Sequence, residues 1–363
     1  MKMVKNEERG LAMFEKSLQL VKSGVGTAFP CAAVAIGAGH EVFVRQFFGH
    51  RQLQPAILDM TEDTRFDLAS LSKLVATTMV ALKFLEKGKL SLDDRIGNYL
   101  DYTGNFRDCQ IRHLMTHTSG LPAGIPLFLM NDQCEDAVRL VLDADRCYPT
   151  GEAVCYSCMG YLVLQRILEE IGGESLDKIA AKYVFEPLGM KTACYNPAQG
   201  VPVAATERYA HTGQWATGHV HDENAYFFGG IAGNAGVFAT LDDMIPFAMM
   251  CAAKGIALNG ERYLSTEMFN LATTNYTPEK EESRGLGFQL KGKQPFPGGE
   301  LMSAGSYGHT GFTGTSLYID HNSGLWGILL TNAVHFGREN RGNYFALRRA
   351  FYDMMMTEHS RKG

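Results

Sequence analysis

Several features that would assign this 363-residue chain to a class at once are missing from it. No apolar run approaches the roughly 18 residues that a membrane-spanning helix needs, and the first ten residues lack the apolar stretch of a signal peptide. The 8 cysteines follow no framework spacing, which is typical of a reducing compartment. We therefore expect a cytoplasmic protein without a membrane span, or an exported one whose leader has been removed.

Two further absences narrow the possible functions. The chain has no excess of basic residues, because its formal net charge is −5 and its pI is near 6.1. This balance argues against nucleic acid as the main partner. The sequence also contains no Gly-x-Ser-x-Gly, which disfavours a nucleophile placed on a strand-to-helix elbow. Hydrophobic residues make up 45% of the chain, which is enough for a sizeable core.

A serine and a lysine stand three positions apart at the start of an apolar-periodic segment that runs from Ser70 to Gly88. This spacing puts Ser70 and Lys73 on one helical face, where the lysine could take the serine proton. The serine would also lie at the positive end of a helix dipole. A serine at a helix start is more often a cap, and a second match, Ser175 with Lys178, is better explained that way.

A tyrosine follows further along the chain, where a loop meets a predicted helix over 161–168. Cations near Tyr156 would allow its hydroxyl to act as a base, although a half-buried packing tyrosine is the plainer interpretation. Cys155 and Cys158 flank it in a Cys-x-x-Cys. A redox motif would need a thioredoxin-like context and a zinc site would need a second pair, so two small buried thiols are the default.

A glycine-rich stretch around His309 precedes a predicted strand over 315–319. The glycines allow the backbone to approach a ligand closely. His309 would then lie on a sheet edge and offer a ring nitrogen beside free backbone groups. The same tripeptide recurs at 211–213 among turn residues, where a loop or hairpin is the better interpretation.

Taken in order, Ser-x-x-Lys, the tyrosine motif and His-Thr-Gly resemble the motif set of the serine β-lactamase and penicillin-binding protein superfamily. The likeness covers nearly the whole chain, is closest to the class C branch of esterases and cell-wall amidases, and includes stretches at 90–96, 111–122 and 220–243. It implies a serine hydrolase that forms an acyl-enzyme on a small-molecule or peptide substrate, acts as a monomer, and needs neither metal nor cofactor. The implied catalytic residues are Ser70, Lys73, Tyr156 and His309. The implied oxyanion donors are the backbone N–H groups of Ser70 and Phe312, and the implied substrate contacts are Cys158, Thr310, Gly311 and Asn332.

Two positions depart from the members of that superfamily that hydrolyse β-lactams. Cys158 stands where they usually carry asparagine, and His309 stands where they usually carry lysine. A thiol bonds poorly in place of an amide, and a histidine is mostly neutral where a lysine is positive. We expect His309 to be neutral, because Lys73 should resist a second positive charge. Both changes weaken the case for a dedicated β-lactamase, and Cys158 leaves open a non-catalytic protein that binds peptidoglycan fragments.

The predicted elements run α/β, then all-α, then α/β. Strands are expected at 31–36, 41–48, 315–319 and 325–331, an amphipathic helix at 11–21 and a final helix at about 340–356. We infer an α/β (α+β) fold in which an antiparallel sheet is flanked by the N- and C-terminal helices. Residues 1–69 and 220–363 would form the sheet domain and 70–219 an inserted helical domain, with the active site in the cleft between them.

Overall fold

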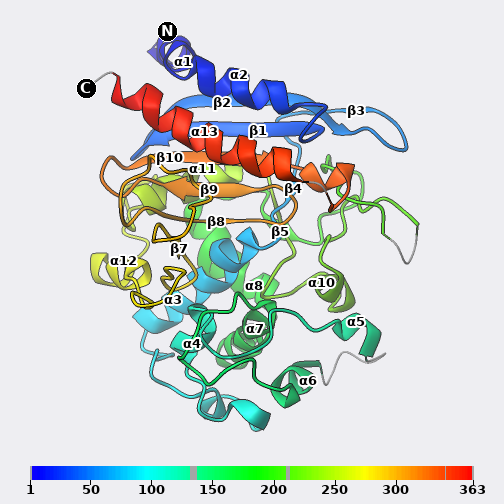
Figure 1. The fold of residues 1–363 in the computed structure, drawn as a ribbon, viewed down its shortest axis with the longest axis vertical. Helices are drawn as coiled ribbons and strands as arrows, with labels where there is room; N and C mark the ends of the chain where they lie inside the picture. Colours follow the sequence, from blue (N-terminus) through cyan, green and yellow to red (C-terminus); the bar gives the residue numbers. More distant parts are fainter. Residues whose placement is uncertain (1, 131–136, 210–212, 340, 362–363) are drawn as a thin grey trace.

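The computed structural model describes residues 2–130, 137–209, 213–339 and 341–361, and it shows a twisted sheet with helices on both faces (Figure 1). The helices from the two ends of the chain cover one face, and the helices from the middle of the chain lie beyond the other. The predicted fold class is confirmed. The copy of His-Thr-Gly at 211–213 falls largely outside the described residues.

The main sheet has 7 strands in the order β3-β2-β1-β10-β9-β8-β7, and every neighbouring pair is antiparallel. Its centre joins the two ends of the sequence, since Ala32 of β1 pairs with Thr331 of β10. The strands are β1 (Cys31–Ala38), β2 (Glu41–Gln52), β3 (Leu58–Asp59), β7 (Gln289–Leu290), β8 (Tyr307–Thr310), β9 (Ser316–Ile319) and β10 (Leu325–Thr331).

Alternation along β1 explains how both faces of the sheet are buried. Ala32, Val34 and Ile36 belong to the cluster formed with the terminal helices α2 (Glu15–Gly24) and α13 (Gly342–Ser360). Ala33 and Ala35 point the other way, into the cluster that contains α11 (Leu241–Ala252). Successive strand residues face opposite sides, so a strand buried on both faces reads as a continuous apolar run.

The terminal helices differ from the prediction in one respect. Instead of a single amphipathic helix at 11–21, the chain forms α1 (Lys2–Met13) and α2, with Phe14 between them. Glu358 on α13 is buried and accepts hydrogen bonds from the backbone N–H groups of Lys16 and Ser17, at 2.9 and 3.0 Å. A carboxylate at a helix N-terminus is favourable, so this contact ties the last helix to the second.

The middle of the chain is mainly helical, as predicted. The segment after Ser70 begins with a wider π-helical turn, η1 (Lys73–Thr78), before it continues as α3 (Met79–Glu86). Ser175 of the second Ser-x-x-Lys lies at the N-cap position of α8, a different helix from the one that follows Ser70. The other helices here are α4 (Ile111–Met115), α5 (Leu127–Met130), α6 (Ala137–Asp143), α7 (Cys158–Gly172), α8 (Leu176–Ala180), η5 (Ala181–Phe185) and α9 (Glu186–Leu188), with 3₁₀ turns η2 (Ile96–Asn98) and η3 (Gly104–Phe106).

A small second sheet lies beside the start of this helical part. It has the order β4-β6-β5, from β4 (Phe66–Asp67), β6 (Val237–Ala239) and β5 (Cys194–Tyr195). The remaining helices are α10 (Glu223–Phe227), α12 (Thr266–Thr273) and the 3₁₀ turn η6 (Ala333–Phe336). Within the described ranges, no helix has the length and apolar character to cross a membrane. The domain boundaries at 69 and 220 stay a prediction.

Candidate active site

The side chains of Ser70 and Lys73 are joined by a hydrogen bond. The Lys73 ammonium group lies 2.9 Å from Ser70 Oγ, 3.0 Å from the Asn234 carbonyl oxygen and 3.3 Å from Cys158 Sγ. Lys73 is fully buried, whereas Ser70 is partly exposed. The ammonium donates to the hydroxyl in this state, so Lys73 can take the Ser70 proton only after it has lost one of its own.

The backbone just before Ser70 is held in an unusual conformation. Ala69 has φ of +46°, which a residue with a side chain rarely adopts. Its N–H donates to Asp67 Oδ1 at 2.8 Å, and the second oxygen of Asp67 accepts the N–H of His221 at 2.6 Å. These bonds fix the turn, so that Ser70 is presented at its end with an N–H that donates to no other group among the described residues.

Tyr156 lies among two cations and two histidines. Its ring centroid is 4.9 Å from Lys73 Nζ and 5.3 Å from Arg284 Cζ. The rings of His117 and His309 lie 4.5 and 5.9 Å away. The buried hydroxyl of Tyr156 makes no hydrogen bond of ordinary geometry to the described residues, although it lies close enough to Lys73 to interact with its charge. The structure thus brings two of the other predicted catalytic side chains, Lys73 and His309, next to Tyr156.

The start of α7 sets the position of Tyr156. Ser157 caps this helix, since its Oγ accepts the N–H of Gly160 at 3.3 Å and donates to the Pro122 carbonyl at 2.6 Å. The backbone N–H of Ser157 donates to His117 Nδ1 at 3.1 Å. The residue next to Tyr156 is therefore anchored on both sides, which fixes the ring above Lys73.

Burial and the neighbouring groups act on the pKa of Lys73 in opposite directions. Burial by itself lowers the pKa of Lys73, but negative charge on Cys158 and Tyr156 opposes this and the net direction is upward. Lys73 therefore carries its proton in this state, and it must give that proton up before it can receive the one from Ser70.

His309 is neutral at ordinary pH. Burial lowers its pKa to about 3, with further contributions from the positive charges of Arg284 and Lys73. Its Nδ1 is 2.7 Å from the Thr310 carbonyl and is therefore assigned the proton. The direction agrees with the expectation from the sequence, although burial is the larger cause. Because β7 pairs only with Tyr307 and Gly308, the strand edge from His309 onward is open, as predicted.

The two residues that the resemblance implies as oxyanion donors, Ser70 and Phe312, lie on segments that are bonded to each other. The hydroxyls of Thr313 and Thr315 donate to the carbonyls of Asp67 and Leu68 at 2.7 and 2.9 Å. These bonds hold the turn after β8 against the residues that precede Ser70. Gly311 is needed there, because a Cβ atom would lie 2.2 Å from the Leu68 carbonyl oxygen. Neither the N–H of Phe312 nor that of Ser70 donates to any group in the described part of the chain.

Two of the predicted substrate contacts have different outcomes. Cys158 lies in the cluster, 3.3 Å from Lys73 Nζ, and is partly exposed. Asn332 is 1% exposed, and its amide donates to the carbonyls of Arg51 and Ala205. Its oxygen accepts the N–H of Cys31 at 3.3 Å and the thiol of Cys31 at 3.2 Å. This geometry does not support a substrate role for Asn332, whose amide joins three segments of backbone instead.

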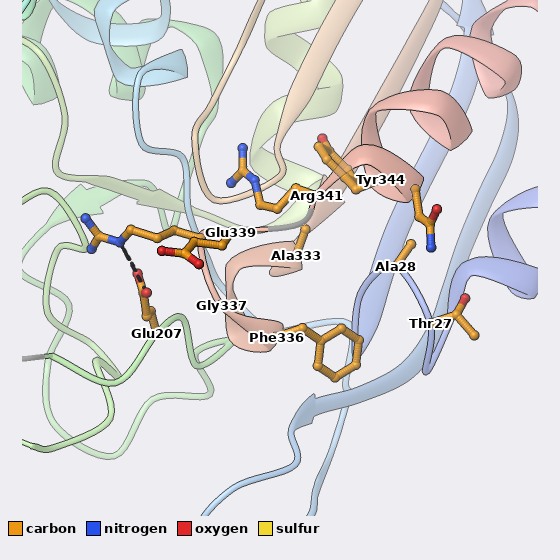
Figure 2. Close-up of a pocket in the computed structure, with 11 residues that line it drawn as sticks. Thr27, Ala28, Glu207, Ala333, Phe336, Gly337, Glu339, Arg341 and Tyr344 are labelled. Atoms are coloured by element: carbon orange, nitrogen blue, oxygen red, sulfur yellow. Dashed lines mark hydrogen bonds and ion pairs between the residues drawn. The ribbon is translucent and has the colours of Figure 1, made fainter.

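A cavity lined by charged residues lies next to the turn after β8 that carries Phe312, which we call the oxyanion turn. It has a volume of about 530 Å³, and Figure 2 shows Glu207, Arg341 and Tyr344 around it. Arg341 donates to the Phe312 carbonyl, and its guanidinium carbon lies 4.3 Å from the centre of the Phe312 ring. Glu207 is paired with Arg338 at 2.9 Å. The cavity and the oxyanion turn therefore share a contact through Arg341.

Sequence reasoning missed two residues of this cluster. His117 lies within one of the stretches that carry the resemblance, but nothing in the stretch indicates which residue faces Tyr156. The two threonines that flank it are a weak local signal, and its φ of +59° is known only from the structure. Arg284 has no signal in the sequence, because it reaches Tyr156 from a loop 128 positions away.

Comparison with known proteins agrees with this geometry. Residues 18–351 match the Beta-lactamase family. The chain belongs to that family, and it is a serine hydrolase by this membership. It is 27% identical to a putative D-alanyl-D-alanine carboxypeptidase of Escherichia coli K12 over 357 aligned positions, which cover 87% of this chain and 81% of the relative. It is also 27% identical to an N-acetylmuramyl-L-alanine amidase of Bacillus subtilis 168, with 87% and 80% covered.

Solved structures show the same fold. EstCE1, a hydrolase with promiscuous acyltransferase activity, superposes with a TM-score of 0.75 at 20% identity and covers 95% of this chain and 99% of its own. A penicillin-binding protein homologue from Caulobacter crescentus superposes with a TM-score of 0.74 at 18% identity, covering 94% and 97%. At these identities the likeness establishes the fold alone.

Proposed function

We propose that this protein hydrolyses an amide or ester through an acyl-enzyme on Ser70. The observation that carries the proposal is the 2.9 Å contact between Lys73 Nζ and Ser70 Oγ, next to two backbone N–H groups without a partner in the described structure. Ser70 Oγ attacks the substrate carbonyl, and its proton passes to whichever of Lys73 and Tyr156 is unprotonated in the reacting complex. The oxyanion is bound by the N–H groups of Ser70 and Phe312, and each such donor contributes about 10²–10³ in rate.

The same groups complete the reaction. The proton held on Tyr156 or Lys73 is delivered to the leaving amine or alcohol, which leaves the acyl group on Ser70. Water then attacks the acyl-enzyme and the proton returns by the same route. The neutral ring of His309 serves as a hydrogen-bonding group on the open edge of β8, where Thr310 and Gly311 also face the substrate.

The substrate class we favour is a peptidoglycan-derived peptide or amide. The support for this is the pair of relatives named as a carboxypeptidase and an amidase, each of which spans most of the chain. Small esters are a further possibility in view of EstCE1. We propose that the protein acts as a monomer, and its cytoplasmic location stays a prediction.

A second candidate is a non-catalytic protein that binds peptidoglycan fragments. Cys158 favours it, because a thiol stands where the β-lactam-hydrolysing members usually carry asparagine. The two functions differ in covalent chemistry, since only a catalytic serine becomes labelled by a fluorophosphonate.

The deciding experiment compares Ser70→Ala with Ser175→Ala. We expect Ser70→Ala to abolish fluorophosphonate labelling and turnover across a panel of short esters, D-peptides, muropeptides and a cephalosporin. Ser175→Ala, at the second Ser-x-x-Lys, should leave both intact. Near-normal turnover by Ser70→Ala would refute the mechanism, and a wild-type protein that binds muropeptides without labelling would favour the binding function.

A further inference from the structure

Arg284 is a buried cation that the mechanism above does not use. The residue as a whole is only 5% exposed, and its guanidinium carbon lies 5.3 Å from the centre of the Tyr156 ring. The backbone on either side is fixed, because its N–H donates to Thr277 Oγ1 at 2.9 Å and its carbonyl accepts the N–H of Tyr276 at 2.9 Å. The arginine is thus held in place before any substrate binds.

The counter-ion of Arg284 lies on the outer side. Glu282 accepts from Arg284 Nε at 3.0 Å, and the side chain of Glu282 is 38% exposed, against 6% for that of Arg284. The carboxylate is therefore partly solvated while the guanidinium is not. Solvent screens the negative partner more than the positive one, so a net positive field reaches the interior.

The two histidines beside Tyr156 do not add to that field. The pKa of His117 and that of His309 are both lowered by burial and by the charges of Arg284 and Lys73, so both rings are neutral. Lys73 and Arg284 are then the two cations that contact the Tyr156 ring in the described structure. The titratable and charged groups around Tyr156 come from several elements. They are Lys73 on η1, His117 after α4, Cys155 directly before Tyr156, Cys158 and Tyr161 on α7, Asp222 before α10, Glu282 and Arg284 before β7, His309 on β8 and Tyr318 on β9.

We propose that Arg284 is a positioning residue for catalysis, whose charge replaces the one that is missing at position 309. Negative charge develops on Tyr156 whenever it is ready to take the Ser70 proton. A cation over the ring face stabilises that charge. Lys73 stabilises this charge from one side of the ring and Arg284 stabilises it from another. The neutral ring of His309 cannot do so. The inference rests on the proposed function, because it assigns Tyr156 a part in proton transfer.

The test is the pH profile of kcat/KM for a neutral ester, measured from pH 5 to 10. Arg284→Gln should lower kcat/KM at pH 7 by about 10- to 100-fold, a fraction of the roughly 10²–10⁴ that general base catalysis contributes. The acid limb of the profile, where kcat/KM falls as the pH drops, should move to higher pH in this variant. The reason is that Tyr156 loses its proton less readily without the cation. Arg284→Lys should keep the wild-type limb.

Two further variants make the proposal specific. Arg284→Gln combined with His309→Lys returns a positive charge to the site from the strand edge and should move the acid limb back toward that of wild type. Glu282→Gln removes the counter-ion and should move the limb to lower pH. If Arg284→Gln does not fold, an unchanged limb in Glu282→Gln overturns the proposal by itself.

Other roles for Arg284 give different results. A purely structural arginine would lower the melting temperature and leave the limb where it is, and this outcome overturns the proposal. A loss confined to substrates that carry a carboxylate, with the neutral ester unaffected, overturns it as well. Fluorophosphonate labelling distinguishes a failure of the proposed function from a failure of this inference. A wild type that is neither labelled nor active overturns both. A wild type that is labelled and active, with variants whose acid limb does not shift, overturns the inference alone.

Discussion

Acidification should destabilise the folded protein, because the buried ring of His309 resists protonation. The ring is 3% exposed, and burial lowers its pKa to about 3, whereas a histidine in an unfolded chain titrates near 6.5. Between about pH 6.5 and 3 the unfolded chain binds a proton that the folded chain does not. Stability contributed by the neutral ring is therefore fully present above pH 6.5 and is lost as the pH falls.

The size of this effect can be worked out. Each pH unit below 6.5 costs about 1.4 kcal/mol, so at pH 5 the loss is about 2 kcal/mol. For a chain of 363 residues, an unfolding entropy of about 2.1 cal/mol/K per residue converts this to about 2–3 °C in melting temperature.

The assay is thermal unfolding, followed by circular dichroism, of wild type and His309→Gln between pH 7.5 and 5. Taking the difference between the two proteins cancels the carboxylates and the other histidines. The variant should gain about 2–3 °C relative to wild type over this range. His219→Gln, at an exposed position, is the control and should give a flat difference. A flat difference for His309→Gln as well would mean that the buried ring takes up a proton like a free histidine, which would refute the reasoning.

Two other predictions concern different parts of the molecule. Glu358→Gln removes the charge that accepts the N–H groups of Lys16 and Ser17, so it should lower the free energy of unfolding by about 1.5–3 kcal/mol in urea titrations; a change below about 0.5 kcal/mol would contradict the proposed link between α13 and α2. Cys158 should react more slowly with a thiol reagent once a phosphonate occupies Ser70, in a background where exposed Cys147 is replaced by serine. Equal rates with and without the phosphonate would place Cys158 outside the site.

The long strands could be predicted from the sequence because burial on both faces leaves a plain signal. The predicted strand at 325–331 coincides with β10, a run of seven buried residues. The strands β3, β4, β5 and β7 have two residues each and carry no periodicity to detect. Their positions follow from tertiary pairing, which local patterns do not record.

The residues of the candidate site also differ in whether the sequence could predict their contacts. Ser70 and Lys73 are one helical turn apart, so their contact follows from local geometry. Arg284 and His117 reach Tyr156 only through the packing of distant segments. For Asn332 the resemblance implies a substrate contact, whereas its amide donates to backbone carbonyls at positions 51 and 205, which no spacing predicts.

The pairing of β1 with β10 has a consequence for synthesis on the ribosome. Ala32 already has its partner Phe48 on β2 when the early hairpin emerges, but its other partner, Thr331, is made 299 residues later. At about 5–20 residues per second, the free edge of β1 waits for about 15–60 s. An unpaired apolar strand edge is a template for pairing with another chain. Nascent copies on one polysome are therefore at risk of joining each other during this interval, and holdase chaperones that cover the hairpin should decide the yield of active protein.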